Sequence, residues 1–271
     1  MKKALILFVI ITASSFLLGS QILFAQSKGE VKMEWLSHSH FRFTSPTGKI
    51  WLTNPHLENV DNKTKLEDLT KVDVILVADG HGDEIGKAPE IAKRTGAKIV
   101  TVGELARGYL QMVAKVSEKQ LVASGIGNVH NIDGVKVRLV HSIHGSRVPD
   151  PSAPYGGPAA GFIITFENGL TVYFTGSTAI HSDLALYGSL YKPDIAIIIL
   201  SGARDPRDAA HMVRLLTTDN PNLKTVLPHH HRIKPREGTA TPAAMEAEIK
   251  KLGLPVTFLN PELGKVYSFT K

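Results

Sequence analysis

The sequence predicts an α+β fold in which two mixed β-sheets are covered by outer helices. Early and in the middle of the chain, short apolar runs are separated by Pro/Gly, Asp-Gly and Asn-Gly turns, the pattern of strands joined in hairpins. In the last third, strand-like apolar runs alternate with helical segments, which indicates sheets with helices on their outer sides. The 271 residues, of which 43% are hydrophobic, suffice for one large domain with a substantial core.

The first expected elements are strands. Residues 31–36 and 40–45 have β-like patterning, and a Pro/Gly turn joins the second run to residues 49–54 as a hairpin. Residues 72–78 form a continuous apolar run bounded by polar residues, which suits a strand buried on both faces.

Two helices and a strand are expected next. Pro89 suits the first turn of a helix and Gly96 suits its end, which predicts a helix over residues 89–96. Residues 97–102 have the apolar pattern of a strand, and residues 103–115 have helical character.

The middle of the chain contains two hairpin signals and a long loop. An Asp-Gly pair separates two strand-like runs within residues 127–146, and Asn168-Gly169 separates alternating apolar runs within residues 161–177. Between these hairpins, residues 148–161 are rich in proline and glycine and predict a long loop of the kind that often borders a site.

The last third alternates between helix and strand without a linker, a low-complexity block or a short repeat. The expected elements are, in order, helix 182–191, strand 193–200, helix 205–218, strand 223–228, helix 241–253 and strand 255–260.

The N-terminal segment has the order of a secretory signal peptide. Two lysines precede an apolar run over residues 4–19, and Ala25 offers a small residue for cleavage. We therefore expect residues 1–25 to be a signal peptide, residues 26–271 to be a single domain, and the mature protein to be secreted or periplasmic. The alternative is an uncleaved membrane anchor, because the apolar run extended to Ala25 could just span a bilayer.

Composition excludes several kinds of site and partner. The absence of cysteine excludes disulfides, thiolate metal ligands and lipid attachment at an N-terminal Cys. Removal of the predicted signal peptide takes away two lysines and no acid, so the formal net charge falls from +6 to a mild +4. The basic residues are scattered and no aromatic residues interleave with them, so we expect no nucleic-acid partner. The expected partner is a small-molecule substrate, with membrane contact only through an uncleaved N-terminal segment.

A glycine-spaced polar loop follows the predicted strand at residues 72–78. Asp79, His81 and Asp83 alternate in an extended segment, so their side chains can point to one side, and Glu84 can turn inward as the next helix begins. Imidazole and carboxylate are the usual ligands of first-row divalent metals, although an ordinary polar turn has the same composition. His144 and His230 also follow predicted strands, and strand ends that carry such groups can converge at one edge of a sandwich.

Six stretches of the chain carry a resemblance to a known family, and the resemblance runs over roughly residues 31–266. They are "WLSHSHFRF", "VILVADGHGDEIG", "SIHGS", "YGGPAAGFII", "YFTGSTA" and "VLPHHHR". These stretches are similar to elements of the metallo-β-lactamase superfamily, in its branch of ascorbate-6-phosphate lactonase-like, metal-dependent hydrolases. The resemblance implies a four-layer αββα sandwich with a metal site at one edge.

The resemblance implies a set of metal ligands, some of them substituted. The six matching positions are Asp79, His81, Asp83, Glu84, His144 and His230. Asp79 and Glu84 stand where the family has histidines, Ser177 stands at the metal-bridging aspartate, and Asn54 stands at another aspartate common in the branch. Three histidines and three carboxylates make a site rich in oxygen, so the expected cofactor is one or two divalent ions, zinc or manganese. Loss of the bridging carboxylate favours one ion, or two with unequal affinity.

The function implied by the resemblance is a secreted metal-dependent hydrolase that uses a metal-activated water on a lactone, ester, amide or phosphoester. The first ion is expected at Asp79, His81 and His144, and the second at Asp83, Glu84 and His230. Asp83 or Glu84, where not engaged by metal, is the expected general base.

Two other functions compete with this one. A non-catalytic member with a degenerate site, which binds metal or another ligand, is the alternative, because positions 79, 84 and 177 depart from the family pattern. A serine hydrolase is disfavoured, since the sequence around Ser177 lacks the Gly-x-Ser-x-Gly elbow.

Several further histidines compete for roles near this site. His38 is expected to be structural and to hold the loop by hydrogen bonds, and His181 is expected at the surface. His141 precedes His144 by three residues, and His230 lies within a triple histidine, so in each case a neighbour offers the same imidazole.

Overall fold

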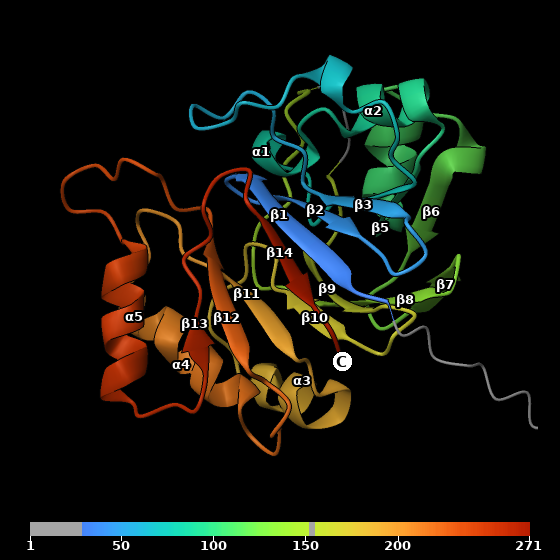
Figure 1. Cartoon of the computed structure of the whole chain (residues 1–271). Helices are drawn as coiled ribbons and strands as arrows, with labels where there is room; N and C mark the ends of the chain where they lie inside the picture. Colours follow the sequence, from blue (N-terminus) through green and yellow to red (C-terminus); the bar gives the residue numbers. More distant parts are fainter. Residues whose placement is uncertain (1–28, 152–154) are drawn as a thin grey trace, which may run out of the picture.

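The computed structural model of the chain describes residues 29–151 and 155–271, so the predicted signal peptide, residues 1–25, lies outside the described residues. Two seven-stranded mixed sheets pack face to face, and helices cover their outer sides (Figure 1). The predicted four-layer αββα sandwich is confirmed. Among the described residues, no helix is both long enough and apolar enough to cross a membrane.

Each sheet combines antiparallel hairpins with parallel strands. The first sheet has the order β14 (Val266–Phe269), β1 (Val31–Ser37), β2 (His40–Thr44), β3 (Ile50–Thr53), β4 (Val74–Leu76), β5 (Lys98–Val102) and β6 (Leu121–Ser124). The second has the order β13 (Thr257–Phe258), β12 (Thr225–His229), β11 (Ile195–Ile199), β10 (Thr171–Phe174), β9 (Ala160–Thr165), β8 (Val135–His141) and β7 (Val129–Ile132).

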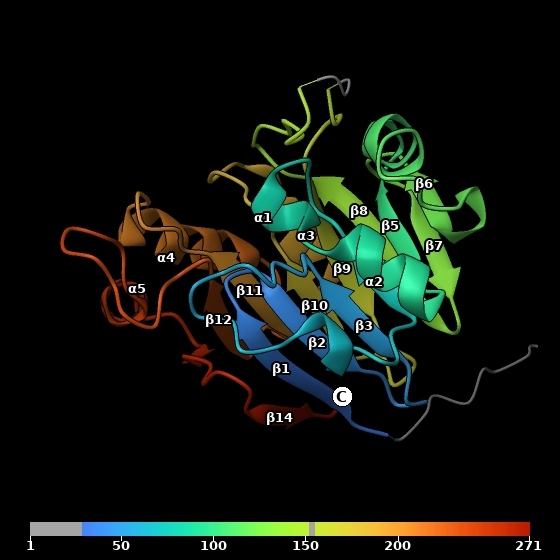
Figure 2. The ribbon, with the colours of Figure 1, turned by 90° about the horizontal axis from the view of Figure 1, so that it is seen from above.

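The helices divide between the two outer faces (Figures 1 and 2). The first sheet carries α1 (Gly82–Ile85), α2 (Ala88–Thr95) and a π-helical segment (Leu105–Gln111). The second sheet carries α3 (Asp183–Tyr191), α4 (Pro206–Leu216) and α5 (Pro242–Lys251). Two short 3-10 helices, Leu66–Asp68 and Glu118–Gln120, lie in connections.

The turn and cap signals of the sequence account for the hairpins and for α2. Asp133 and Gly134 both have positive φ, 52° and 92°, as the tight turn between β7 and β8 requires. Asn168-Gly169 joins β9 to β10, which pair antiparallel. Gly96 ends α2 in the left-handed conformation, with φ of 80°.

One local prediction was wrong, and one expected helix is present with an unusual geometry. Residues 79–84 do not form one extended loop, because His81, with ψ of 152°, is the N-cap of α1, and Gly82 already begins a helical turn. The helix expected over residues 103–115 contains a π-type turn, in which the Ala114 amide donates to the Tyr109 carbonyl five residues back. Strands β6 and β14 were not predicted from the sequence.

The inner faces of the two sheets form the larger of two apolar clusters. Phe41 of β2 packs edge-on against Phe174 of β10, with ring centroids 6.3 Å apart, and Phe43 packs against Phe166 at 5.9 Å. The smaller cluster lies between the second sheet and its helices, where Met212 and Met245 are buried. Burial between the sheets therefore fixes where their strand ends lie relative to one another.

The carboxyl ends of strands from both sheets meet at one edge of the sandwich. β4 leads to Asp79, and β10 and β12 lead to Ser177 and His230. β8 runs parallel to β10, because both pair antiparallel with β9, so the segment with His144 leaves β8 at the same edge. The predicted convergence of strand ends is confirmed.

We expect Gly86→Ala to destabilise the fold by at least about 2 kcal/mol. Gly86 ends α1 with φ of 47°, and a Cβ there would collide with the Pro55 carbonyl, which accepts from the Lys87 amide at 2.9 Å. Gly82→Ala is the matched control, since a Cβ on Gly82 meets no atom within 4 Å and alanine favours helix by about 0.5–1 kcal/mol. Urea unfolding of both variants measures the difference, and equal stability would contradict the close approach.

Candidate metal centre

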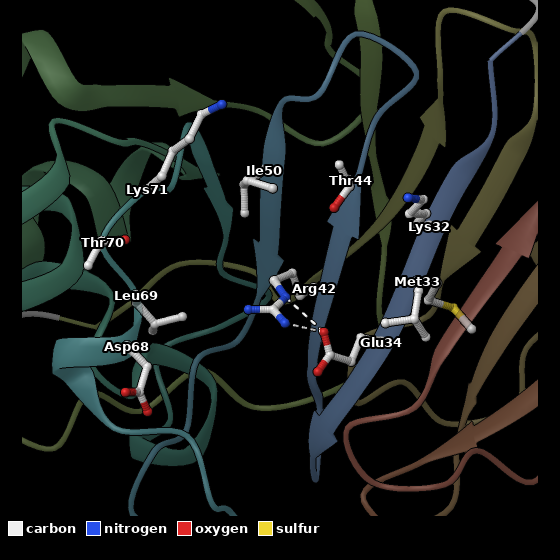
Figure 3. A pocket seen from close by; sticks show the side chains of 11 residues that line it. Lys32, Met33, Glu34, Arg42, Thr44, Ile50, Asp68, Leu69, Thr70 and Lys71 are labelled. Atoms are coloured by element: carbon white, nitrogen blue, oxygen red, sulfur yellow. Dashed lines mark hydrogen bonds and ion pairs between the residues drawn. The ribbon is translucent and has the colours of Figure 1, made fainter.

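A pocket of about 240 Å³ opens at the edge where the strand ends converge. Four of its lining residues can bind metal: His81, Asp83, His144 and His230. The others lie at or after the ends of β10 and β11: Ser177, Ile199, Ser201 and Arg204. A second pocket, of about 310 Å³, lies on the outward faces of β1 to β3, where Arg42 donates to Glu34 (Figure 3). No histidine lines that pocket, so it lacks the converging imidazole and carboxylate groups of the first.

Asp79, His81 and His144 form the first group that can hold an ion, with one ligand atom from each residue within 4.8 Å of the others. Oδ1 of the fully buried Asp79 accepts from the His81 amide at 2.9 Å and pairs with His81 Nδ1 at 2.8 Å. This hydrogen bond raises the pKa of His81, and in the neutral ring it places the proton on Nδ1 and leaves Nε2 free to bind metal. Burial lowers the pKa of His144, which favours its neutral, ligating form. The three residues predicted for the first ion therefore lie together.

His38, Asp83 and His230 form the second group. His38 Nε2 lies 3.1 Å from Asp83 Oδ2, and the His38 and His230 rings have centroids 3.9 Å apart. The hydrogen bond with His38 lowers the pKa of Asp83 far below its usual range. The sequence singled out His38 but gave it only a structural role, whereas the structure places it among the possible ligands.

Glu84 lies beside this second group. It is buried in α1, accepts from Ser177 Oγ at 2.6 Å, and lies 3.2 Å from His230 Nε2. Burial, followed by the charges of Asp79 and Asp83, raises the pKa of Glu84 well above its usual value. Its side chain therefore faces the centre, and its predicted ligand role stays a prediction.

Because α1 begins at Gly82, Asp83 does not share a side with Asp79 and His81 in an extended loop. The helical turn directs its carboxylate to His38, across the site from the first group. The prediction that one loop would supply an alternating row of ligands was wrong, although Asp83 still lies with His230, as predicted.

A chain of hydrogen bonds sets the orientation of His230. Thr175 Oγ1 donates to the Gly176 carbonyl at 2.9 Å, so its lone pairs accept from the Ile199 amide and from His229 Nε2, at 3.2 and 3.1 Å. With its proton on Nε2, His229 accepts from His230 through the contact of 2.7 Å between their Nδ1 atoms. The partners thus assign the His230 proton to Nδ1 and leave Nε2 as a lone pair facing the centre.

The remaining residues singled out in the sequence lie around the centre. Asn54 has φ of 38°, and its Oδ1 accepts from the Ala78 amide at 3.0 Å, which holds the end of β4. His141 is exposed and outside both groups, so His144 is the one brought to the site. His181 is only partly exposed, contrary to the surface position expected, and its ring packs against Tyr187.

The charges and donors of the centre fit a divalent cation. Asp79, Asp83 and Glu84 bring three carboxyl groups together, and the buried Asp79 Oδ2 has no hydrogen-bond partner among the described residues. A buried carboxylate oxygen without a donor is costly, and a bound cation removes that cost. Two groups of two histidines and one aspartate match the ligand types of zinc and of other first-row metals.

Comparison with known proteins agrees with this geometry. The model of the beta-lactamase superfamily domain matches residues 47–253. The chain belongs to this family. It is 34% identical to a UPF0173 metal-dependent hydrolase of Thermodesulfovibrio yellowstonii over 98% of each chain. It is also 34% identical to a protein of the same name from Rubrobacter xylanophilus, over 83% of this chain and 91% of the relative.

Two solved structures have the same sandwich. Igni18, a metallo hydrolase from Ignicoccus hospitalis, superposes with a TM-score of 0.72 and 28% identity, over 89% of this chain and 99% of that one. An isothiocyanate hydrolase from Delia radicum gut bacteria has a TM-score of 0.66 over 88% of this chain and 99% of its own, and at 17% identity shows the shared fold alone. The predicted superfamily is confirmed, and the narrower lactonase-like branch stays a prediction.

We expect Thr175→Val to weaken zinc binding by about 10- to 100-fold, because it removes the acceptor that orients His229 and, through it, His230. Thr101→Val is the matched control, since Thr101 is equally buried and donates only to the Val77 carbonyl. Calorimetric titration of both variants with zinc checks this. Equal loss of affinity in the two would show that the effect is a general loss of packing.

Proposed function

We propose that this protein is a metal-dependent hydrolase of small molecules. The observation that carries the proposal is the pair of adjacent groups, each of two histidines and one aspartate, at the converging strand ends. Four of these six residues line the same pocket, so a substrate in the pocket meets both groups. The names of the relatives, metal-dependent hydrolase, support the same reaction class.

Different residues of the centre would hold each ion and accept a proton. Asp79, His81 and His144 would hold one ion, and His38, Asp83 and His230, with Glu84 beside them, would hold the second. A bound divalent ion supplies Lewis acidity, which lowers the pKa of water and polarises a carbonyl or phosphoryl oxygen. Of the two carboxyl groups predicted to take a proton, Asp83 lines the pocket and Glu84 does not, so Asp83 would be the proton acceptor in a protein that holds only the first ion.

Zinc and manganese are both candidates for the bound ion. The sequence suggested three imidazoles and three carboxylates, but the position of His38 adds a fourth imidazole and brings the donor set closer to that of zinc hydrolases. Ser177 supplies a hydroxyl where the family pattern has a bridging carboxylate, and this hydroxyl bonds to Glu84. We therefore propose two ions of unequal affinity.

With zinc or manganese bound, the protein should hydrolyse at least one member of a panel of lactones, esters, amides and phosphoesters. His144→Ala and His230→Ala should each lower kcat/KM by at least about 100-fold, because each removes one ligand of a different group. His211→Ala is the control: this partly exposed histidine of α4 accepts a hydrogen bond from Arg214, does not line the pocket, and should retain the wild-type rate. Metal content is measured on every variant.

Two results would contradict the proposed activity. If the protein binds two ions and hydrolyses nothing on the panel, the non-catalytic binding member is the better description. If His144→Ala and His230→Ala bind less metal yet keep the wild-type rate, the reaction takes place elsewhere.

We also propose that the protein is exported and cleaved near Ala25, from the order of lysines, apolar run and small residue in the first 25 residues. Mass spectrometry of the protein from its native host should find a mature N-terminus close to Gln26. An intact Met1-Lys2-Lys3 terminus would point instead to an anchored protein.

A further inference from the structure

Arg204 lines the same pocket as four of the metal-binding residues. It follows β11 on the segment that leads into α4, and its guanidinium reaches back to the end of β10. Nη1 donates to the Thr178 carbonyl and Nη2 to the Ser177 carbonyl, both at 2.6 Å. These two hydrogen bonds fix the position of the guanidinium, and both acceptors are backbone carbonyls, so neither bond neutralises its charge.

No aspartate or glutamate among residues 29–151 and 155–271 forms an ion pair with Arg204. Two other arginines do pair with acids: Arg207, three residues on, binds Asp205, and Arg42 binds Glu34 in the outer pocket (Figure 3). A guanidinium has five N–H donors, and the two carbonyls engage two of them. Arg204 therefore keeps a charge and three N–H groups, including Nε–H, for a ligand.

The charge of Arg204 lies beside the metal-binding groups, because Arg204 lines the same pocket as His144 and His230. Burial lowers the pKa of Arg204, but a guanidinium stays protonated at any ordinary pH. A partly buried cation that forms no ion pair among the described residues, beside a metal centre, is suited to an anion that enters with the substrate.

We propose that Arg204 is a specificity residue that binds an anionic group, a carboxylate or a phosphate, on the substrate of the proposed hydrolase. This inference rests on the proposed function. The pocket of about 240 Å³ limits the substrate to a small acid, whose scissile bond lies at the histidine and aspartate groups while its anion lies at the guanidinium. A purely structural Arg204 would instead only fasten the segment after β10.

The test compares Arg204→Gln with Arg204→Lys, and uses Arg207→Gln as the matched control. Each zinc-loaded protein receives three aryl esters that share one short acyl chain, ending in a free carboxylate, a phosphate or a neutral methyl ester. Arg204→Gln should lower kcat/KM by about 100-fold on whichever charged ester the wild type prefers, and by less than about 3-fold on the neutral one. Arg204→Lys should recover part of the loss, and Arg207→Gln should match the wild type on all three.

A binding measurement separates this inference from the proposed activity. Calorimetric titration of the zinc-loaded proteins with succinate and with inorganic phosphate should show at least about 10-fold weaker binding of one of them to Arg204→Gln than to wild type. If the wild type hydrolyses no ester but this difference is found, the proposed hydrolase fails and the anion site stands.

Equal rate losses on charged and neutral esters, together with equal anion binding by wild type and Arg204→Gln, would overturn the inference. Arg204 would then be a fastening residue in an active hydrolase. Thermal melts accompany each variant. If Arg204→Gln does not fold, the comparison of Arg204→Lys with wild type on the charged and neutral esters decides, and an unchanged ratio of rates overturns the inference.

Discussion

The centre depends on one backbone contact between the two sheets. The His38 carbonyl, just after β1, accepts from the His230 amide, just after β12, at 3.1 Å, and from Trp35 Nε1 at 3.0 Å. Both histidines have positive φ, 49° and 67°, a region that non-glycine residues occupy only when the surroundings require it. Packing between the sheets holds these two strained turns together, and as a result the imidazoles from different sheets lie with their centroids 3.9 Å apart, tilted by 49°.

Because the two strand ends are joined, the carboxyl groups of Asp79, Asp83 and Glu84 lie close together. Each has its own partner: Asp79 pairs with His81, Asp83 with His38, and Glu84 with Ser177. The residues that depart from the family pattern therefore contact the centre directly: Asp79 orients a neighbouring imidazole, and Ser177 donates to Glu84. This arrangement is more consistent with an adapted site than with one that has drifted to arbitrary residues.

The same edge of the sandwich also explains why a cation and anions occur together there. The segment after β10 supplies the backbone carbonyls of Ser177 and Thr178, and these position the Arg204 guanidinium. The loop after β4 and helix α1 supply carboxylates to the same site. A substrate in this pocket therefore meets both carboxylates that suit a metal and a cation that suits an acid.

The sequence by itself determined the sandwich, most of its strands and helices, the superfamily and the strand ends that carry the site. These depend on local chemistry: Asn168-Gly169 and Asp133-Gly134 permit tight turns, and Pro89 and Gly96 delimit α2. Only the tertiary structure decided that His38 joins Asp83 and His230, that α1 begins at Gly82 and turns Asp83 out of the row of Asp79 and His81, and that Arg204 forms no ion pair among the described residues. His38 and Asp83 are 45 residues apart and His230 comes from the other sheet, and packing of the whole core sets such contacts, while local sequence patterns do not.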